Sequence, residues 1–295
     1  MHKLEKYPLL VLIFGVLGIS LSAIFVRLSD APSVVTATSR LLWTVLLMTP
    51  MVLGRGAYRK ELAALSPAQW LKSIISGVFL GFHFALWFES LQKTSVASST
   101  AIVCTEVIWV ALGYCLFMKG RLSKKAVFSI ALAMAGSVII AFSDSGSGES
   151  HLYGDLLSAV SAMAISVYIL LGKDLRERMT ATVYTYLVYA ACSITLVILT
   201  AIQGYGVSDF TPSALASGLL LGVFSTILGH SIFSWCLKYF SPAFVSASKL
   251  CEPVVAALVA AVAFAEIPKP LQIAGGIIVI AGVYLYSKEE RKKEQ

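Results

Sequence analysis

Five charged residues of this sequence lie inside long apolar stretches, where a formal charge is costly: Arg40, Glu89, Glu106, Lys249 and Glu252. On insertion scales, a charged side chain at the centre of a bilayer costs about 2.5–3.5 kcal/mol, so such residues face a cavity or a partner. A carboxyl group can exchange a proton, and a nearby cation can hold an anion. Together, such groups are suited to binding a small charged molecule.

The composition places these charges in a membrane protein. Of the 295 residues 58% are apolar, the mean hydropathy is +0.82, and only 23 basic and 16 acidic residues carry a formal charge. Because a soluble fold could not bury so much apolar surface, the net charge of +7 does not indicate a disordered, collagen-like or nucleic-acid-binding protein. Apolar runs of about 20 residues cross a bilayer as helices. They predict an all-α membrane protein with ten transmembrane helices, at residues 8–27, 33–53, 70–91, 95–118, 124–142, 152–171, 179–203, 211–237, 242–264 and 271–287.

The basic residues alternate between the loops as membrane topology requires, because cytoplasmic loops are enriched in Lys and Arg. With the N-terminus inside, 18 of the 23 basic residues lie in inner segments and three in outer segments. A different helix count would disrupt this pattern, so we expect both termini in the cytoplasm. The first helix could also be read as a signal peptide with a cleavage site near Ser20–Ser22, but the repeat described next needs it as a helix.

The sequence matches itself at an offset of 146 residues, without a gap over much of each half. Small apolar matches are common by chance, but Glu106 also falls on Glu252. Each half then has five helices, and an odd number inserts the second half upside down. We therefore expect two inverted five-helix repeats, residues 1–145 and 146–295, that form one transport domain. Inverted repeats are typical of secondary transporters, whose site lies between the halves.

Several motifs resemble the EamA family of the drug/metabolite transporter superfamily. They are the stretch Ser248–Leu258 with its Glu-Pro pair, Phe264-Ala265-Glu266, and Leu271–Gly276, within the five-plus-five layout. The first half departs from the family pattern, with Val107 in place of the proline and Gly120 in the place of Glu266. The resemblance implies a ten-helix plasma-membrane carrier that works by alternating access. It also implies that the substrate is a small polar or amphiphilic metabolite of the amino-acid or organic-acid class. Export is favoured over uptake.

Lys249 and Glu252 are three residues apart, which places them on one helical face within pairing distance. Pro253 lacks an N–H group, so the helix should kink there and leave the carbonyl of residue 249 without its helical partner. The alternatives are a substrate-binding corner at a broken helix and a buried structural ion pair. Val103 is the repeat mate of Lys249, so this charge breaks the symmetry and is the better substrate candidate.

Glu106 has no cation on its own helix, and burial away from water would favour its neutral, protonated form. It is therefore a candidate for proton coupling, although a static bridge to Arg40 is the alternative. Arg40 stays ionised and can grip a carboxylate with two parallel hydrogen bonds. With Lys249 it suggests that the substrate carries an acidic group, and a bridge between helices is the alternative role for Arg40.

Further candidates are less specific. Glu89 and His230 are candidates for proton coupling, and His83 for substrate binding, although a lone histidine in a membrane more often serves packing. Aromatic residues favour the lipid interface, so most of those around His83, namely Phe79, Phe82, Phe84, Trp87 and Phe88, are expected outside the site. Weaker candidates for the cavity wall are Trp109, Tyr114, Tyr168, Tyr184 and Tyr189. Gly77–Gly81 and Gly218–Gly222 have GxxxG spacing, which favours close packing within the chain or a dimer seam.

Other function classes find little support in the sequence. It has no P-loop or metal-binding spacing, so we expect no ATP-driven pump, no metal and no cofactor. The five cysteines lie within spans without CxxC spacing and are expected to be apolar filler. No spacing of Ser, His and Glu residues assembles the active site of an intramembrane enzyme. A membrane scaffold that does not transport is the other alternative to a transporter. The expected partners are a small-molecule substrate, the lipid bilayer and possible coupling protons, and no nucleic acid. The protein is expected to be a monomer or a homodimer.

Overall fold

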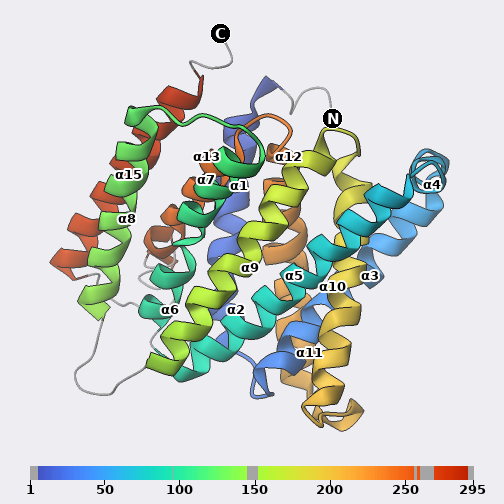
Figure 1. Ribbon diagram of the computed structural model, residues 1–295. Helices are drawn as coiled ribbons and strands as arrows, with labels where there is room; N and C mark the ends of the chain where they lie inside the picture. Colours follow the sequence, from blue (N-terminus) through green and yellow to red (C-terminus); the bar gives the residue numbers. More distant parts are fainter. Residues whose placement is uncertain (1–5, 95, 145–151, 256–257, 260–268, 292–295) are drawn as a thin grey trace.

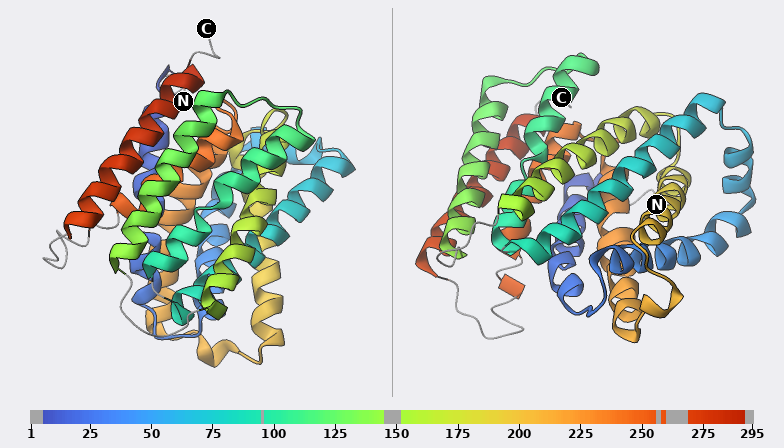
Figure 2. Two further views of the ribbon diagram at one scale, coloured as in Figure 1. Left: turned by 60° about the vertical axis from the view of Figure 1, so that its left-hand side comes forward. Right: turned by 60° about the horizontal axis from the view of Figure 1, so that its bottom comes forward.

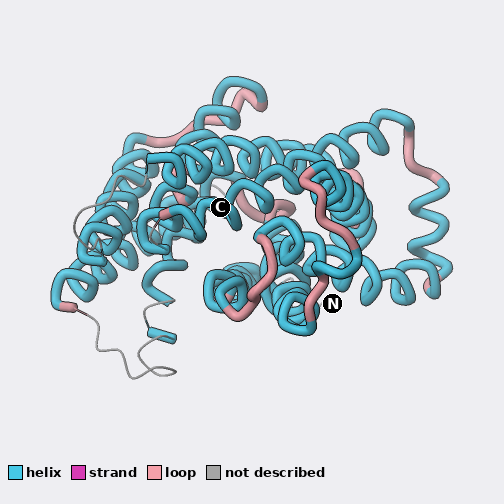
Figure 3. Tube along the Cα trace, turned by 90° about the horizontal axis from the view of Figure 1, so that it is seen from below, coloured by secondary structure: helices cyan, strands magenta, loops and turns pink. Residues whose placement is uncertain are grey.

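The computed structural model describes residues 6–94, 96–144, 152–255, 258–259 and 269–291. Across these residues the chain is helical with short connections and no β-strand (Figure 3). The first half contains α1 (Pro8–Ser20), α2 (Ser22–Arg27), α3 (Ser33–Gly54), α4 (Gly56–Ala63), α5 (Pro67–Lys93), α6 (Val96–Val103), α7 (Glu106–Phe117) and α8 (Lys124–Asp144). The second contains α9 (Leu152–Arg176), α10 (Ala181–Ile202), η2 (Val207–Asp209), α11 (Pro212–Leu220), η3 (Leu221–His230), α12 (Ser231–Cys236), α13 (Pro242–Ser248), η4 (Lys249–Cys251) and α15 (Pro270–Arg291).

These helices confirm the predicted all-α membrane class. Eight stretches among the described residues are long and apolar enough to span a membrane. Three of them combine shorter elements, namely α1 with α2, α6 with α7, and α11 with η3 and α12. The two further predicted helices correspond to α8 and to residues 242–264, of which 256–257 and 260–264 lie outside the described residues. The short helix α4 was not predicted.

Hydroxyl caps fix where several helices begin, sometimes earlier than the apolar pattern suggested. Helix α5 starts at Pro67 instead of residue 70, because Ser66 and Gln69 form a capping box and proline suits the first helical position. Thr211 caps α11 and Ser241 caps α13 in the same way, each followed by a proline. These caps satisfy N–H groups that would otherwise be left unpaired at the helix ends.

The packing follows the symmetry of two inverted repeats. Helices α8 and α15, the last of each half, lie side by side and run in opposite directions (Figures 1 and 2). Helix α5 of the first half packs on α9 and α10 of the second. The corresponding helix of the second half, formed by α11, η3 and α12, packs on α1 and α3 of the first. The core is therefore built mainly between the halves.

Glycines allow these contacts between the halves. A Cβ atom at Gly77 would overlap the carbonyl oxygen of Val188 and lie 2.6 Å from Cβ of Ala191, both in α10. A Cβ atom at Gly218 would overlap Ser39 of α3. Both GxxxG pairs thus serve packing within the chain, where small residues let helix backbones approach closely.

Polar contacts join the halves at both ends of the bundle. At the end where α1 begins and α15 ends, Glu61 accepts hydrogen bonds from N and Oγ1 of Thr180, at 2.7 and 2.8 Å (Figure 1). At the opposite end, Asp155 accepts hydrogen bonds of 2.9 Å from Thr94 and Ser98. The two halves are therefore joined by polar contacts at both ends of the bundle.

A second contact at that opposite end involves Asp30, which accepts hydrogen bonds from Ser213 and Thr211 across the halves. These two hydroxyl groups, with Ser213 contributing more, hold the pKa of the Asp30 carboxyl group below its usual value. A carboxyl group that accepts hydrogen bonds is stabilised as its anion, so this contact is favoured while Asp30 is ionised.

Replacing Gly77 by Ala should separate α5 from α10 and lower the free energy of unfolding. We expect a loss of about 1–3 kcal/mol, the usual cost of overpacking, because the added methyl group meets a backbone carbonyl that cannot rotate away. Thermal unfolding of the purified protein in detergent measures the change.

The matched control is Gly54→Ala, because a Cβ atom at Gly54 meets nothing within 4 Å. This variant should unfold close to the wild-type temperature. Equal unfolding temperatures for both variants would contradict the assigned contact between α5 and α10.

Candidate functional site

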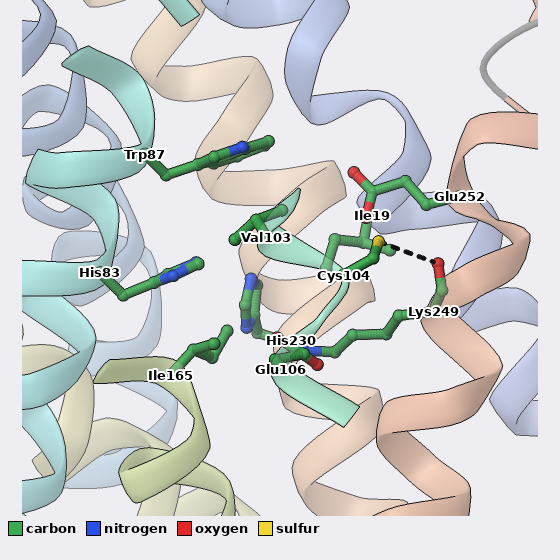
Figure 4. A pocket seen from close by; sticks show the side chains of 10 residues that line it. All are labelled: Ile19, His83, Trp87, Val103, Cys104, Glu106, Ile165, His230, Lys249 and Glu252. Carbon is green, nitrogen blue, oxygen red and sulfur yellow. Dashed lines mark hydrogen bonds and ion pairs between the residues drawn. The ribbon is translucent and has the colours of Figure 1, made fainter. Parts of the chain in front are cut away.

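A cavity lies between the two halves, where the intramembrane charges gather (Figure 4). In this conformation it holds about 20 Å³ of free space, which is about the room for one water molecule. Both halves contribute side chains, from α1, α5, α6, α7, α9, η3 and η4 and their connections. The lining residues are Ile19, His83, Trp87, Val103, Cys104, Glu106, Ile165, His230, Lys249 and Glu252.

An ion pair between the halves crosses this site. Nζ of Lys249 lies 2.9 Å from Oε1 of Glu106, and both side chains are almost fully buried. The same oxygen of Glu106 accepts a hydrogen bond of 2.8 Å from Oγ of Ser246. Ser166 of α9 bonds the backbone carbonyl of Glu106 at 3.2 Å. Charge-assisted hydrogen bonds are stronger than neutral ones, so this carboxylate is firmly held.

This pairing differs from the two ion pairs that the sequence offered as alternatives. One of them joined Lys249 to Glu252, three residues along its own helix, but the ion pair of Lys249 is with Glu106 of the other half. The alternative partner of Glu106 was Arg40, whose Nε instead donates to Oγ1 of Thr226 at 2.7 Å. Spacing along one helix could not reveal that a carboxylate of another helix lies within reach.

In each half, one helix is interrupted at the level of this ion pair. In the second half, η4 is a 3₁₀ turn at Lys249–Cys251, which Glu252 and Pro253 follow. In the first half, α6 ends at Val103 and α7 begins at Glu106, although this half lacks the proline. The thiol of Cys104 contacts the carbonyl oxygen of Lys249 at 3.9 Å, so the two breaks meet (Figure 4). The sequence predicted a kink only at Pro253 and missed the break in the first half.

Glu252 faces the cavity from the side opposite His83 and Trp87 (Figure 4). It is 6% exposed. Within the described part of the chain, no Lys, Arg or His lies within ion-pair distance of its carboxyl group. The two glutamates that match across the repeat thus have different surroundings, because Lys249, the described cation at this level, pairs with Glu106.

Arg40 is fully buried beside the cavity. Its guanidinium carbon lies 4.1 Å from the centre of the Phe84 ring, and that ring meets His230 edge-on at 5.3 Å. Nη1 and Nη2 of Arg40 have no hydrogen-bond partner among the described residues. A buried guanidinium is costly unless its N–H groups are bonded, so these two nitrogens are available to an anion.

A π-helix positions the partner of Arg40. Over Leu221–His230 the backbone takes wide turns, in which hydrogen bonds span five residues and which often mark functional sites. Thr226 Oγ1 donates to the carbonyl oxygen of Leu221 at 3.1 Å while it accepts from Arg40. The sequence carries no recognised signal for such a helix.

The two histidines lie on corresponding helices and both reach the cavity. Nδ1 of His83 lies 2.8 Å from Oγ and 3.2 Å from the carbonyl oxygen of Ser161, which fixes the ring against α9. Nδ1 of His230, in contrast, has no partner among the described residues. Both rings lie among aromatic side chains, including Phe84 and Trp87.

The aromatic face of α5 was partly misassigned. Phe79 and Phe82 are exposed, as expected of lipid-facing residues, but Trp87 lines the cavity and Phe84 lies beneath Arg40. With Leu80 and Leu91, Phe84 and Trp87 form a buried stripe at helical spacing. That spacing, rather than the residue type, was the available signal.

The remaining candidates lie away from the lined cavity. Trp109 is 39% exposed on the outside of α7. Glu89 lies 3.7 Å from Lys93 at a partly exposed position of α5. Tyr168 and Tyr184 are buried and bond Ser234 at 2.7 Å and Ser76 at 3.0 Å. The described residues contain no group of three His, Cys, Asp or Glu side chains able to hold a metal ion.

Comparisons with known proteins agree with this architecture. The model of the EamA-like transporter family matches residues 6–142 and 152–288, two ranges that begin 146 residues apart. An uncharacterized transporter of Archaeoglobus fulgidus is 26% identical over 255 residues, 84% of this chain and 86% of that protein. A probable terminal-alkyne amino-acid exporter of Streptantibioticus cattleyicolor is 27% identical over 203 residues, 68% of this chain and 67% of that protein. A solved crystal structure covers 98% of this chain and 99% of its own, with a TM-score of 0.77 and 19% identity, which shows a shared fold.

Replacing Lys249 by Met should destabilise the protein by about 3–5 kcal/mol, because it leaves the charge of Glu106 buried without compensation. The double variant Lys249→Met/Glu106→Gln should recover much of this loss, since it removes both charges. The free energy of unfolding in detergent, measured by denaturant titration, tests this coupling.

The matched control is Glu177→Gln, which removes an ion pair of 3.9 Å with Lys173 whose Glu177 side chain is 60% exposed. Exposed pairs contribute about 0–1 kcal/mol, so this variant should unfold nearly as the wild type does. Purely additive losses in the double variant would contradict the importance of the buried pair.

Proposed function

The chain belongs to the EamA-like transporter family and is a membrane transporter; on that premise we propose that it is a secondary carrier that exports a small amino acid or a related organic acid. The observation that supports this most is the cavity between the halves, where a buried cation and two carboxyl groups face one space. Charges at membrane depth are costly and are kept where a pathway uses them.

The cavity offers complementary groups for a zwitterion. Glu252 can accept hydrogen bonds from an ammonium group, and the Nη atoms of Arg40, which is buried beside the cavity lining, can donate to a carboxylate when the site opens. The side chains of Ile19, Val103 and Ile165 give the lining an apolar part that an aliphatic side chain can contact. The relative from Streptantibioticus cattleyicolor that is named a probable amino-acid exporter supports both the substrate class and the direction.

The contacts at the two ends of the bundle support alternating access. The bonds of Glu61 to Thr180 at one end and of Asp30 to Thr211 at the other join the halves and are exposed. In the proposed cycle, one set breaks while the other holds, so the cavity opens to one side at a time. Exposed hydrogen bonds contribute little net free energy, which lets them exchange readily.

We propose that the chain lies in the plasma membrane with both termini in the cytoplasm. Basic residues cluster in and beside the connections between α3 and α5, α7 and α8, and α9 and α10, which lie at the end where α1 begins and α15 ends (Figure 1). An excess of Lys and Arg favours the cytoplasmic side. One chain supplies the whole cavity lining, so a single chain is the proposed transport unit.

Proteoliposomes that contain the purified protein should show counterflow of a labelled amino acid, tested with L-alanine, L-leucine and L-phenylalanine. Against labelled L-leucine, N-acetyl-leucine and leucinamide should each compete about tenfold less well than leucine. Each analogue lacks one charge, and a hydrogen bond to a charged group is worth about 1.5–3 kcal/mol. Protein-free vesicles are the control, and absence of counterflow with all three amino acids would overturn the proposed substrate class.

Arg40→Gln should raise the KM for leucine by about tenfold or more while competition by leucinamide stays unchanged, since a bidentate carboxylate contact is lost. Arg176→Gln is the matched control. Arg176 is also buried, but it bonds the carbonyl oxygens of Ser234 and Met179, so its guanidinium group is already used within the protein. Equal effects of Arg40→Gln on leucine and leucinamide would indicate a structural role instead.

A further inference from the structure

We propose that Glu252 is the carboxyl group that exchanges a proton in this cavity, and that the proton competes there with the substrate's ammonium group. The proposal rests on the proposed function for the identity of that competitor. It divides the two glutamates of the repeat between different tasks, with Glu106 as a fixed anion and Glu252 as the exchanging group.

Glu106 is already committed to other contacts. Its Oε1 binds Lys249 at 2.9 Å and Ser246 at 2.8 Å, and its side chain is 4% exposed. Protonating Glu106 would discard the attraction to Lys249 and leave that ammonium group buried without compensation. Loss of one partner of a buried pair is strongly destabilising, so a transport cycle that used Glu106 would have to overcome this cost at every turn.

Glu252 has the opposite balance. It faces the cavity and is buried, and no cation of the described residues pairs with it. As an anion it needs a donor from outside the protein, whereas as a neutral acid it does not carry an uncompensated charge. A proton and a substrate ammonium group are both able to satisfy it, and they cannot do so together.

The other titratable groups around Glu252 do not offer an equivalent site. Helices α8 and α15, which also pack against η4, carry their charged residues only near their ends. A proton on either histidine would add a positive charge near Arg40 and Lys249. Among the described residues, the titratable and charged groups that surround Glu252 are Lys249 on its own segment, Arg40 of α3, His83 of α5, Cys104, Glu106 of α7 and His230 of η3.

Every proton in this exchange has a stated source and destination. The Lys249–Glu106 pair is neutral throughout, and Arg40 remains a cation. When an amino acid enters, its ammonium group replaces the proton on Glu252, and that proton leaves to water on the side to which the cavity is open. When the amino acid leaves on the other side, Glu252 takes a proton from that side. One proton therefore moves in for each amino acid that moves out, which couples export to an inward proton gradient.

Dicyclohexylcarbodiimide tests the protonated state without a substrate. This apolar reagent adds to a protonated carboxyl group, and intact-protein and peptide mass spectrometry locate the adduct. In the purified full-length protein we expect one adduct, on Glu252, whose yield falls as the pH is raised, because the reactive form loses its proton. Glu252→Gln should abolish the adduct, and Glu252→Asp should retain it.

Glu106→Gln/Lys249→Met is the matched variant, because it removes the other cavity carboxyl group together with its partner. The adduct on Glu252 should persist in it. An adduct on Glu106 in the wild type, or a persistent adduct in Glu252→Gln, would overturn the assignment. Absence of any adduct in the wild type across the pH range would also overturn it.

Counterflow tests the competition. In the wild type, the KM for L-leucine should rise by about tenfold per pH unit on the acid side, the slope for one proton that competes at one site. Glu252→Gln should show a high KM that does not change with pH. A pH-dependent KM in Glu252→Gln would overturn the competition. Absence of wild-type counterflow with every amino acid would count against the proposed function, while the labelling result would still decide whether Glu252 exchanges a proton.

Discussion

The ion pair of Lys249 and Glu106 is the constraint on which the centre of this protein depends. Two charges are held at membrane depth, where neither is stable alone, and they belong to different halves of the chain. The pair therefore holds α7 against η4. The helix breaks at Cys104 and Lys249 meet at the same level, so the charged centre is also the place where the helices depart from regular geometry.

Around this centre the packing is symmetric, but the chemistry is not. Helix α5 packs on the second half as the segment of α11, η3 and α12 packs on the first, with glycines such as Gly77 and Gly218 at the closest approaches. The symmetry ends at Lys249, whose mate is Val103. One cation therefore serves two matched carboxyl groups, and Glu252 is left facing the cavity.

Weak polar contacts near the surface and a strong ion pair at the centre are an arrangement that fits the proposed carrier. Contacts such as those of Glu61 and Asp30 join the halves at exposed positions, where water can replace them. The buried pair has no such replacement. In the proposed cycle, the halves move so that either end opens while the charged centre keeps its arrangement.

The sequence alone determined the membrane class, the helices, the repeat and the family, because these rest on apolar runs, loop charges and self-similarity along the chain. It also selected Arg40, Glu106, Lys249 and Glu252 as charges without a loop. Tertiary structure decided which of them pair, since a lysine side chain reaches carboxylates on other helices whose positions local spacing does not contain. It also decided which face of α5 is internal, because lipid is as apolar as a protein core and residue type does not separate the two.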